Sequence, residues 1–397
     1  MEKLAIFGGS PVRETPISYG RQYIDDEDIA AVTAILRGDS LTGGPEIAGL
    51  EQKLCEVTGA KYAVAVANGT AALHLAALAA GVRPGDEVIV SAITFAASSN
   101  CVLYCGAMPV FADIRPDTYN IDPASIRKLI TPETKGIVAV DFTGQAVEHE
   151  EIRAICREHG LFLIEDAAHA IGTKYKGQPV GSIADMTCFS FHPVKTVTGG
   201  EGGAVTTNDG QLYRRLIRLR THGITREREE MVHPTDARWY NEQVELGYNY
   251  RLTDFQAALI SSQLNKLSLF SARRKAIVEK YNAAFAEMPE IIVQKEIPES
   301  ETTRHLYILR LDPDRLTCDR RQFFDALWAE NIHSQVHYLP VYRHSYYEKH
   351  GYMKGLCPNA EAYYNEVMSL PLYYSLTDEE VEDVIHAVKK IVDCYRK

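Results

Sequence analysis

Several features are missing from this chain, and each absence narrows what the protein can be. No apolar run is long enough to span a bilayer. The first nine residues contain no signal-peptide core. The net charge of −11 predicts no broad basic surface, which argues against nucleic-acid binding. The eight cysteines include no pair of CxxC clusters, so their spacing does not predict a structural zinc site. We therefore expect no membrane, nucleic acid or metal as a partner.

What is present is the composition of an ordinary globular protein. Of the 397 residues, 46% are apolar and 24% are charged. A chain of this length is long for one core and suits two domains. Scattered cysteines with no framework are typical of reduced thiols packed as small hydrophobes, so we expect a cytoplasmic protein.

From about residue 60 onward, short apolar runs alternate with amphipathic ones. Apolar runs of this length read as buried strands, and the segments between them as helices. Such alternation predicts an α/β fold with a mostly parallel sheet covered by helices on both faces. The expected strands are Tyr62 to Val66, Val88 to Val90, Val110 to Ala112, Ile137 to Val140 and Leu161 to Ile164, with a helix over Ala71 to Ala80 and another through Ile152, Ile155 and Cys156 that ends at Gly160.

The C-terminal part differs in pattern. Residues 253–288 contain neither Pro nor Gly and predict one long helix or two nearly continuous ones. Leu306 to Leu309 and Ser334 to His337 form a candidate strand pair. A capping box at Thr377 and Glu380 begins a final helix. We expect a large domain over residues 1–265, with an N-terminal arm, and a smaller α+β domain over residues 266–397.

Three polar groups follow expected strands and should therefore meet at one edge of the sheet. Lys195 offers a primary amine beside a glycine-rich turn, able to form a Schiff base with an aldehyde or ketone. Asn68-Gly-Thr-Ala71 opens a helix, where Gly69 permits a tight turn and the free amides, including that of Ala71, can hold a phosphate with the Thr70 hydroxyl. Asp166 ends a strand. Amine, phosphate seat and acid are the contacts that pyridoxal 5′-phosphate needs.

Each of these residues also has a plainer interpretation. Asn68 or Thr70 can simply cap a helix, and so can Asp166. His169 can bond the phenolic oxygen of the cofactor, orient Asp166, or be purely structural. Phe95 can stack on the cofactor ring or belong to the core. Ser190 adds a possible hydroxyl for the phosphate.

Five blocks in a fixed order carry a family resemblance. The chain resembles the DegT/DnrJ/EryC1/StrS sugar-nucleotide aminotransferases over nearly its full length. The blocks are Asn68-Gly-Thr-Ala-Ala-Leu-His74, Glu165-Asp-Ala-Ala-His-Ala170, Ser190-Phe-His-Pro-Val-Lys195, Gly200-Glu-Gly-Gly203 and Gly247-Tyr-Asn-Tyr-Arg-Leu-Thr-Asp254.

The resemblance implies an aspartate-aminotransferase-like fold (fold type I) and a homodimer with shared active sites. It implies that Lys195 is the Schiff-base lysine, that Asp166 pairs with the pyridine nitrogen, and that Ser190 and Thr70 bind phosphate. Asn249 matches an asparagine that reaches the cofactor phosphate of the neighbouring subunit, and Gln145 a polar residue beside the cofactor. The expected contacts to the sugar nucleotide are His337, Tyr338 and Arg251.

Further motifs, such as Tyr19-Gly-Arg-Gln22 and Gln335-Val-His-Tyr-Leu-Pro-Val341, resemble the pseudaminic-acid branch of the family. That branch implies transfer of an amino group from L-glutamate to C4 of a UDP-4-keto sugar. An aminotransferase for another 3- or 4-keto sugar nucleotide, carried by UDP or dTDP, is the alternative. A related 3-dehydratase would carry His in place of Lys195. A non-catalytic regulator would have lost the pair of Asp166 and Lys195.

Overall fold

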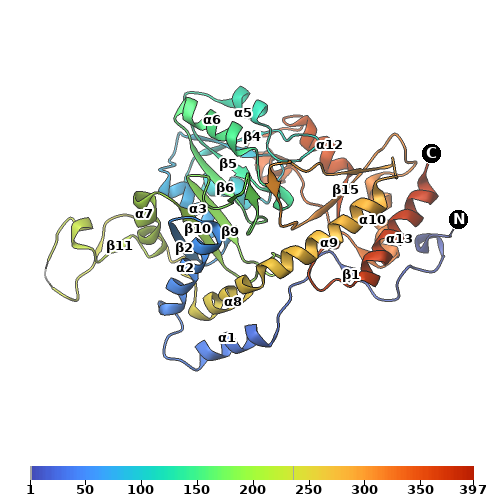
Figure 1. Ribbon diagram of the computed structural model, residues 1–397. Helices are drawn as coiled ribbons and strands as arrows, with labels where there is room; N and C mark the ends of the chain where they lie inside the picture. The colour runs from blue at the N-terminus through green and yellow to red at the C-terminus, as the bar shows by residue number, and fades with distance from the viewer. Residues whose placement is uncertain (1, 236) are drawn as a thin grey trace.

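The computed structural model describes residues 2–235 and 237–397. Its centre is a seven-stranded sheet in the order β2-β10-β9-β6-β5-β3-β4 (Figure 1). Four neighbouring pairs are parallel, while β10 runs antiparallel to both β2 and β9. The strands are β2 (Tyr62–Val66), β3 (Glu87–Ser91), β4 (Met108–Ala112), β5 (Thr134–Val140), β6 (Phe162–Asp166), β9 (Met186–Ser190) and β10 (Gly203–Thr207).

Helices cover both faces of this sheet, and the side-chain alternation of the strands explains why. Val64 and Val66 of β2 pack into the cluster of one face, and Ala63 and Ala65 pack into that of the other. The first face carries α3 (Gly69–Ala79), α4 (Ala97–Tyr104) and α7 (Gly210–Arg220). The second carries α2 (Pro45–Thr58), α5 (Pro123–Leu129), α6 (His149–His159) and α8 (Asp254–Asn265), with α1 (Asp26–Leu36) along α8. The expected α/β fold with a mostly parallel sheet is confirmed.

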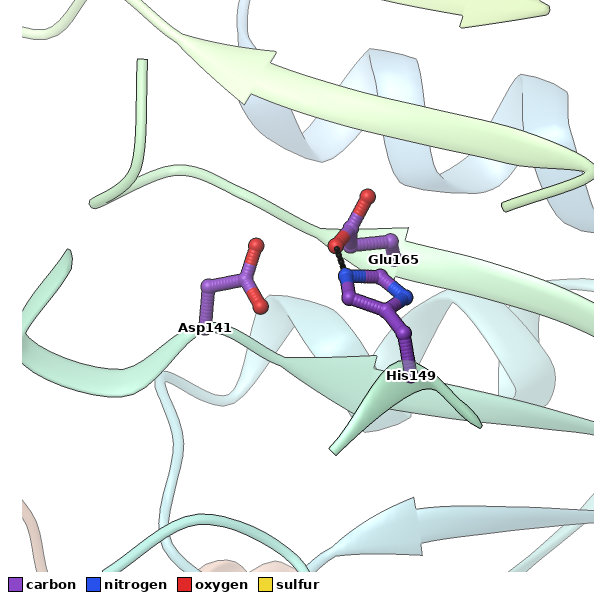
Figure 2. Close-up of side chains that lie close together, drawn as sticks. All are labelled: Asp141, His149 and Glu165. Atoms are coloured by element: carbon purple, nitrogen blue, oxygen red, sulfur yellow. Dashed lines mark ion pairs between the residues drawn. The ribbon is translucent and has the colours of Figure 1, made fainter. Parts of the chain in front are cut away.

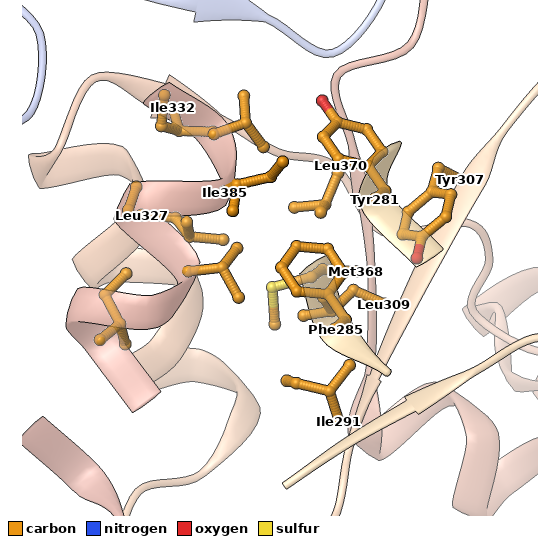
Figure 3. Packing of buried hydrophobic residues seen from close by; sticks show 14 of the residues in the cluster. Tyr281, Phe285, Ile291, Tyr307, Leu309, Leu327, Ile332, Met368, Leu370 and Ile385 are labelled. Carbon is orange, nitrogen blue, oxygen red and sulfur yellow. The ribbon is translucent and has the colours of Figure 1, made fainter. Parts of the chain in front are cut away.

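Residues 253–288 form two helices, α8 and α9 (Leu267–Phe285), and α9 leads into a second core (Figure 1). Here α9, α10 (Arg320–Ala329) and α13 (Asp378–Tyr395) pack against a three-stranded antiparallel sheet. Its strands are β13 (Ile291–Val293), β15 (Tyr307–Leu311) and β17 (Val367–Leu370). Figure 3 shows Phe285 of α9, Leu309 of β15 and Ile385 of α13 meeting in this core.

The predicted pairing of Leu306–Leu309 with Ser334–His337 is wrong. β15 lies between β13 and β17, and residue 335 makes only an isolated bridge to Ser369. Local apolar patterns mark strands but do not select partners, because register depends on distant parts of the chain. The capping box at Thr377 and Glu380 does begin α13 as predicted.

Segments from both ends of the chain tie the two cores together. Leu4 and Ile17 belong to the C-terminal core, and β1 (Ile17–Ser18) pairs with β16 (Ile332–His333). Residues 341–363, with α11 (Ser345–Lys349) and α12 (Pro358–Glu366), pack against Phe111 of β4. The domain boundary near residue 265 therefore stays a proposal.

The remaining strands are short: β7 (Lys174–Tyr175), β8 (Gln178–Pro179) and β14 (Ser300–Glu301) form one small sheet, and β11 (Ile224–Thr225) and β12 (Glu242–Gln243) form another. Among the described residues, no helix is long and apolar enough to cross a membrane.

Candidate active site

A cavity of about 510 Å³ lies where the carboxyl ends of the strands meet the C-terminal core. Asn68, Asp166 and Lys195, which lie far apart in the sequence, all line it. The cavity is within the usual size of a small-molecule site. Its wall also contains Gly69, Thr70, Phe95, His169, Ser190, His337 and Tyr338 from the expected set, together with His305 and His192.

One end of the cavity is the start of α3, directly after β2. The Asn68 side chain caps the helix by accepting from the Ala71 amide at 2.8 Å. Ala71 is therefore occupied, and it does not line the cavity. Among the described residues, no partner is assigned to the amides of Gly69 and Thr70, which remain for an anion at the helix N-terminus. Capping and anion binding thus coexist here.

Two glycines let this end close tightly. A Cβ on Gly69 would lie 2.9 Å from Ser190 Cβ, so the Ser190 hydroxyl is brought against the helix start. A Cβ on Gly203 would lie 2.4 Å from the Asn68 carbonyl oxygen. Only glycine fits where β10 passes Asn68, so β10 can lie directly against the turn before α3.

Asp166 is the last residue of β6 and is buried. Its carboxylate accepts from Ser98 Oγ at 2.6 Å and from the Ala168 amide at 3.1 Å. Burial raises the Asp166 pKa, while the bond from Ser98 and the charge of Lys195 oppose this rise. A buried carboxylate with so little compensation is suited to a cationic partner such as a protonated pyridine nitrogen.

Lys195 follows β9 in a loop closed by its own backbone. Its amide donates to the His192 carbonyl at 2.9 Å, and the Phe191 amide donates to the Gly202 carbonyl at 2.8 Å. Burial lowers the Lys195 pKa from 10.5 to about 8, with Asp166 acting in the opposite sense. The neutral, nucleophilic amine is therefore far more populated near neutral pH than it is in a solvated lysine.

The facing wall comes from four aromatic side chains. His169 Nε2 lies 3.4 Å from Tyr338 Oη, and Phe95 lies 6.3 Å from Tyr338 between ring centroids. Phe95 is 62% exposed, so it is not a core residue. His337 is fixed by Ser369 Oγ at 2.7 Å from its Nδ1. Burial lowers the His169 pKa well below its usual value and the His337 pKa to about 4.

Three expected residues lie elsewhere. The Gln145 side-chain amide donates to the Lys295 carbonyl and accepts from the Ile297 amide, so it joins the segment after β5 to the segment after β13 and does not line the cavity. Asn249 is exposed and Arg251 half-buried, both outside the cavity wall of this chain.

Asp141, His149 and Glu165, the residue directly before Asp166, form a buried polar cluster (Figure 2). His149 Nε2, at the start of α6, lies 2.7 Å from Glu165 Oε1, and Thr187 Oγ1 donates to the other Glu165 oxygen at 2.7 Å. Asp141 follows β5 and points into the same space. Ligand atoms of Asp141, His149 and Glu165 lie within 4.8 Å of one another, a spacing that would also admit a metal ion.

Protons alone can balance this cluster. Burial and the adjacent Glu165 raise the Asp141 pKa well above its usual range. Burial also raises the Glu165 pKa, but His149 outweighs this and the net shift is downward. The raised pKa favours a protonated Asp141, and the lowered pKa favours an ionised Glu165 beside His149. The cluster joins the ends of β5 and β6 to the start of α6, next to Asp166.

Two residues of this site were not predicted from the sequence. Ser98 lies in α4 and His305 precedes β15, and neither belongs to a recognisable local pattern. The apolar run after His305 was identified, but nothing in it indicates that the preceding ring lies against His169.

Comparison with known proteins assigns this arrangement to a family. A cavity at the carboxyl ends of a doubly covered sheet, with an amine, an acid and an anion seat, has the groups that a pyridoxal-phosphate-dependent aminotransferase uses. The chain belongs to the DegT/DnrJ/EryC1/StrS aminotransferase family, whose model matches residues 22–389. The expected family and fold are confirmed.

Two relatives and two solved structures illustrate the likeness. The spore coat polysaccharide biosynthesis protein SpsC of Bacillus subtilis is 41% identical over 95% of this chain and 97% of its own. A UDP-4-amino-4,6-dideoxy-N-acetyl-β-L-altrosamine transaminase of Campylobacter jejuni is 36% identical over 96% and 99%. Helicobacter pylori PseC, an aminotransferase of pseudaminic acid biosynthesis, has a TM-score of 0.89 at 32% identity, covering 96% of this chain and 100% of that one. The pyridoxal-phosphate form of the putative sugar aminotransferase Spr1654 of Streptococcus pneumoniae has the same TM-score and identity, covering 96% and 99%.

Proposed function

We propose that this chain transfers the amino group of L-glutamate to C4 of a UDP-4-keto-6-deoxy-N-acetyl-hexosamine. The product would be UDP-4-amino-4,6-dideoxy-N-acetyl-β-L-altrosamine, the substance for which the Campylobacter relative is named and which leads to pseudaminic acid. The observation that carries the proposal is the convergence of Lys195, Asp166 and the start of α3 on one cavity.

The cavity residues fit pyridoxal 5′-phosphate, the cofactor bound in one form of Spr1654. The amides of Gly69 and Thr70, with the hydroxyls of Thr70 and Ser190, would hold its phosphate. Asp166 would pair with its ring nitrogen, His169 and Phe95 would lie along the ring, and the Lys195 amine would attach covalently. When bound, the cofactor supplies an electron-withdrawing ring that stabilises negative charge on the carbon losing its proton.

In this proposal Lys195 is the residue that moves protons. Its Nζ takes the proton from the α-carbon of glutamate in the first half-reaction and delivers a proton to C4 of the sugar in the second. A positioned proton carrier of this kind contributes about a hundredfold to ten-thousandfold in rate. Asp166 keeps the ring nitrogen protonated throughout, and Ser98 holds Asp166 in place. His337, Tyr338 and, from another subunit, Arg251 would contact the sugar nucleotide.

A homodimer would complete the site. Asn249 lies outside the cavity of its own chain, as expected of a residue that reaches the cofactor phosphate of a neighbour. The segment that precedes it carries large exposed apolar side chains: Val232 is 69%, Trp239 85% and Leu246 75% exposed. Exposed apolar groups gathered on one projecting segment favour a protein contact.

The alternatives differ in which keto sugar is accepted. SpsC, the relative at 41% identity, is named for spore coat polysaccharide, so another 3- or 4-keto sugar nucleotide is the second candidate. A 3-dehydratase with His at the lysine position and a regulator without the catalytic pair are both disfavoured, because Lys195 and Asp166 line the same cavity.

The test is incubation of the purified protein with L-glutamate and a panel of UDP- and dTDP-linked 3- and 4-keto sugars. We expect one amino sugar, formed from the UDP-4-keto sugar and identified by mass and NMR. Amination of a different member of the panel would replace the proposed substrate. A colourless protein that neither takes up pyridoxal phosphate nor aminates any sugar would remove the enzyme proposal altogether.

A further inference from the structure

The His305 side chain is a cavity-wall group that the steps above do not use. It is 5% exposed, and its ring centroid lies 4.4 Å from that of His169. Its Nδ1 is buried and has no hydrogen-bond partner among the described residues. A buried ring nitrogen without a partner is costly, so its retention in a cavity wall calls for an explanation.

The backbone around His305 holds this ring firmly in place. The His305 amide donates to the Thr143 carbonyl at 2.8 Å, and its carbonyl accepts from Arg274 Nη1 at 3.2 Å. Thr143 and Arg304 both adopt left-handed backbone angles, with φ of 63° and 61°. Non-glycine residues rarely take this conformation, and such strain concentrates where a site must be positioned accurately.

Positive charge gathers behind this ring without an anion to balance it. Arg274 is 3% exposed, and its guanidinium donates to the carbonyls of His305 and Leu372 at 3.2 and 2.9 Å. No ion pair joins Arg274 to any described carboxylate. Burial lowers the His305 pKa well below its usual value, and the nearby groups His169, Lys195, Arg274 and His337 lower it further.

The carboxylates that line the cavity do not balance the positive charge beside His305. In the described part of the chain they are Asp166 and Glu201. Asp166 is held by Ser98 and Ala168, and Glu201 is exposed beside the glycine turn. The cofactor phosphate has its own seat at the start of α3. An anion that entered beside His305 would therefore be a second, separate one.

We propose that His305, with the open edge of His337, forms a subsite for a carboxylate group of the amino donor. This inference rests on the proposed function. The corner is enclosed, with both imidazoles no more than 7% exposed, so it suits a small flat carboxylate better than the diphosphate of a sugar nucleotide. A carboxylate there can accept from the edge of the His305 ring that lines the cavity, in front of the unpaired charge of Arg274. The keto acid product carries the same carboxylates and would occupy the same place.

The experiment uses the full protein loaded with pyridoxal phosphate and measures binding of 2-oxoglutarate by calorimetry. The keto acid has no amine to transfer, so binding is read without turnover. We expect His305→Phe to weaken its binding about tenfold to a hundredfold, as loss of a hydrogen bond to a charged group predicts. His159→Phe, at an exposed position outside the cavity wall, is the control and should leave binding unchanged.

UDP serves as the second probe, since a diphosphate could seek the same positive corner. Its affinity should be the same in wild type and His305→Phe. Loss of UDP binding alone would assign the corner to the diphosphate, and unchanged 2-oxoglutarate binding would overturn the subsite. If His305→Phe does not fold, His305→Gln replaces it, with a smaller loss expected.

Failure of this inference is distinct from failure of the proposed function. If glutamate bleaches the visible band of the wild type while His305→Phe still binds 2-oxoglutarate normally, only the subsite is wrong. If the wild type neither binds the keto acid nor reacts with any amino donor, the proposed function fails as well.

Discussion

His149 Nε2 and Glu165 Oε1 lie 2.7 Å apart in the interior of the protein. Both side chains are at most 1% exposed. Glu165 is the residue directly before Asp166. The contact joins the first turn of α6 to β6, so the carboxyl end of the strand that presents Asp166 is fastened from behind. Removal of one partner from such a buried pair leaves the other charge without compensation.

We therefore expect His149→Leu to lower the free energy of unfolding by about 3–5 kcal/mol, measured by urea denaturation of the apoprotein. His159→Leu, on the exposed end of the same helix, should change it by no more than about 0.5 kcal/mol. Because the Glu165 pKa is lowered on folding, this stabilisation should be present above the ordinary glutamate pKa and disappear as the pH falls through the lowered value. Equal losses for both variants would contradict the charge pair.

The variant Asp141→Asn distinguishes between a protonated Asp141 and a metal ion bound in this cluster. If Asp141 holds a proton and donates to Glu165, the amide of asparagine can donate in its place, and stability should change by less than about 1 kcal/mol. A large loss, together with a stoichiometric metal found by elemental analysis of the wild type, would instead identify a metal site.

Lys195 should measurably lower the stability of the apoprotein at neutral pH. Its pKa falls from 10.5 to about 8 on folding, so the deprotonated amine is favoured in the folded state. The penalty on the folded protein therefore builds up as the pH falls from 10.5 to about 8, and it is complete below that pH. Lys195→Met should stabilise the apoprotein at pH 7 by up to about 3 kcal/mol, at 1.36 kcal/mol per pKa unit, and this gain should vanish above pH 10.5.

The same shift predicts how the cofactor is taken up. Attachment of pyridoxal phosphate to the apoprotein should accelerate as the pH rises through about 8, followed by absorbance. A profile that rises only near 10.5 would place Lys195 in a solvated setting and contradict the burial described above.

We expect loss of the Ser98 hydroxyl to reduce turnover less than loss of the Asp166 carboxylate does. Asp166→Asn is expected to fold but to lose nearly all turnover, because a neutral amide cannot keep the ring nitrogen protonated. Ser98→Ala removes the 2.6 Å bond to Asp166, together with the contacts of the same hydroxyl to Thr94 Oγ1 and the Phe95 carbonyl, and turnover should fall about tenfold to a hundredfold. Ser99→Ala is the matched control: its hydroxyl contacts Tyr347 at 2.6 Å and not Asp166. Wild-type rates in Asp166→Asn would reduce that residue to a helix cap.

A hybrid of two inactive variants tests the shared site. When Lys195→Ala and Asn249→Ala chains are co-expressed with different tags, a mixed dimer has one doubly damaged site and one intact site if Asn249 acts across the interface. The purified hybrid should then recover activity absent from both parents. Continued inactivity would return Asn249 to its own subunit or to no role, and a monomer in solution would exclude sharing.

Local patterns in the sequence determined much of the central sheet and placed three residues of the site. Alternating apolar runs marked five strands of the central sheet, and Asn68, Asp166 and Lys195 were placed at one rim because the carboxyl ends of parallel strands share an edge. These inferences succeed because hydrophobic periodicity and helix capping depend on neighbours within a few residues. The resemblance to a family added the expected roles.

Only the tertiary structure decided which candidates share the cavity and which do not. Gln145 is drawn away by the backbone at Lys295 and Ile297, the Ala71 amide is taken by Asn68, and β15 pairs with β17 rather than with residues 334–337. His305 enters the cavity wall because Thr143 and Arg274 hold its backbone from distant parts of the chain. Contacts between segments so far apart are selected by packing and by the satisfaction of buried polar groups, and a local pattern carries no record of either.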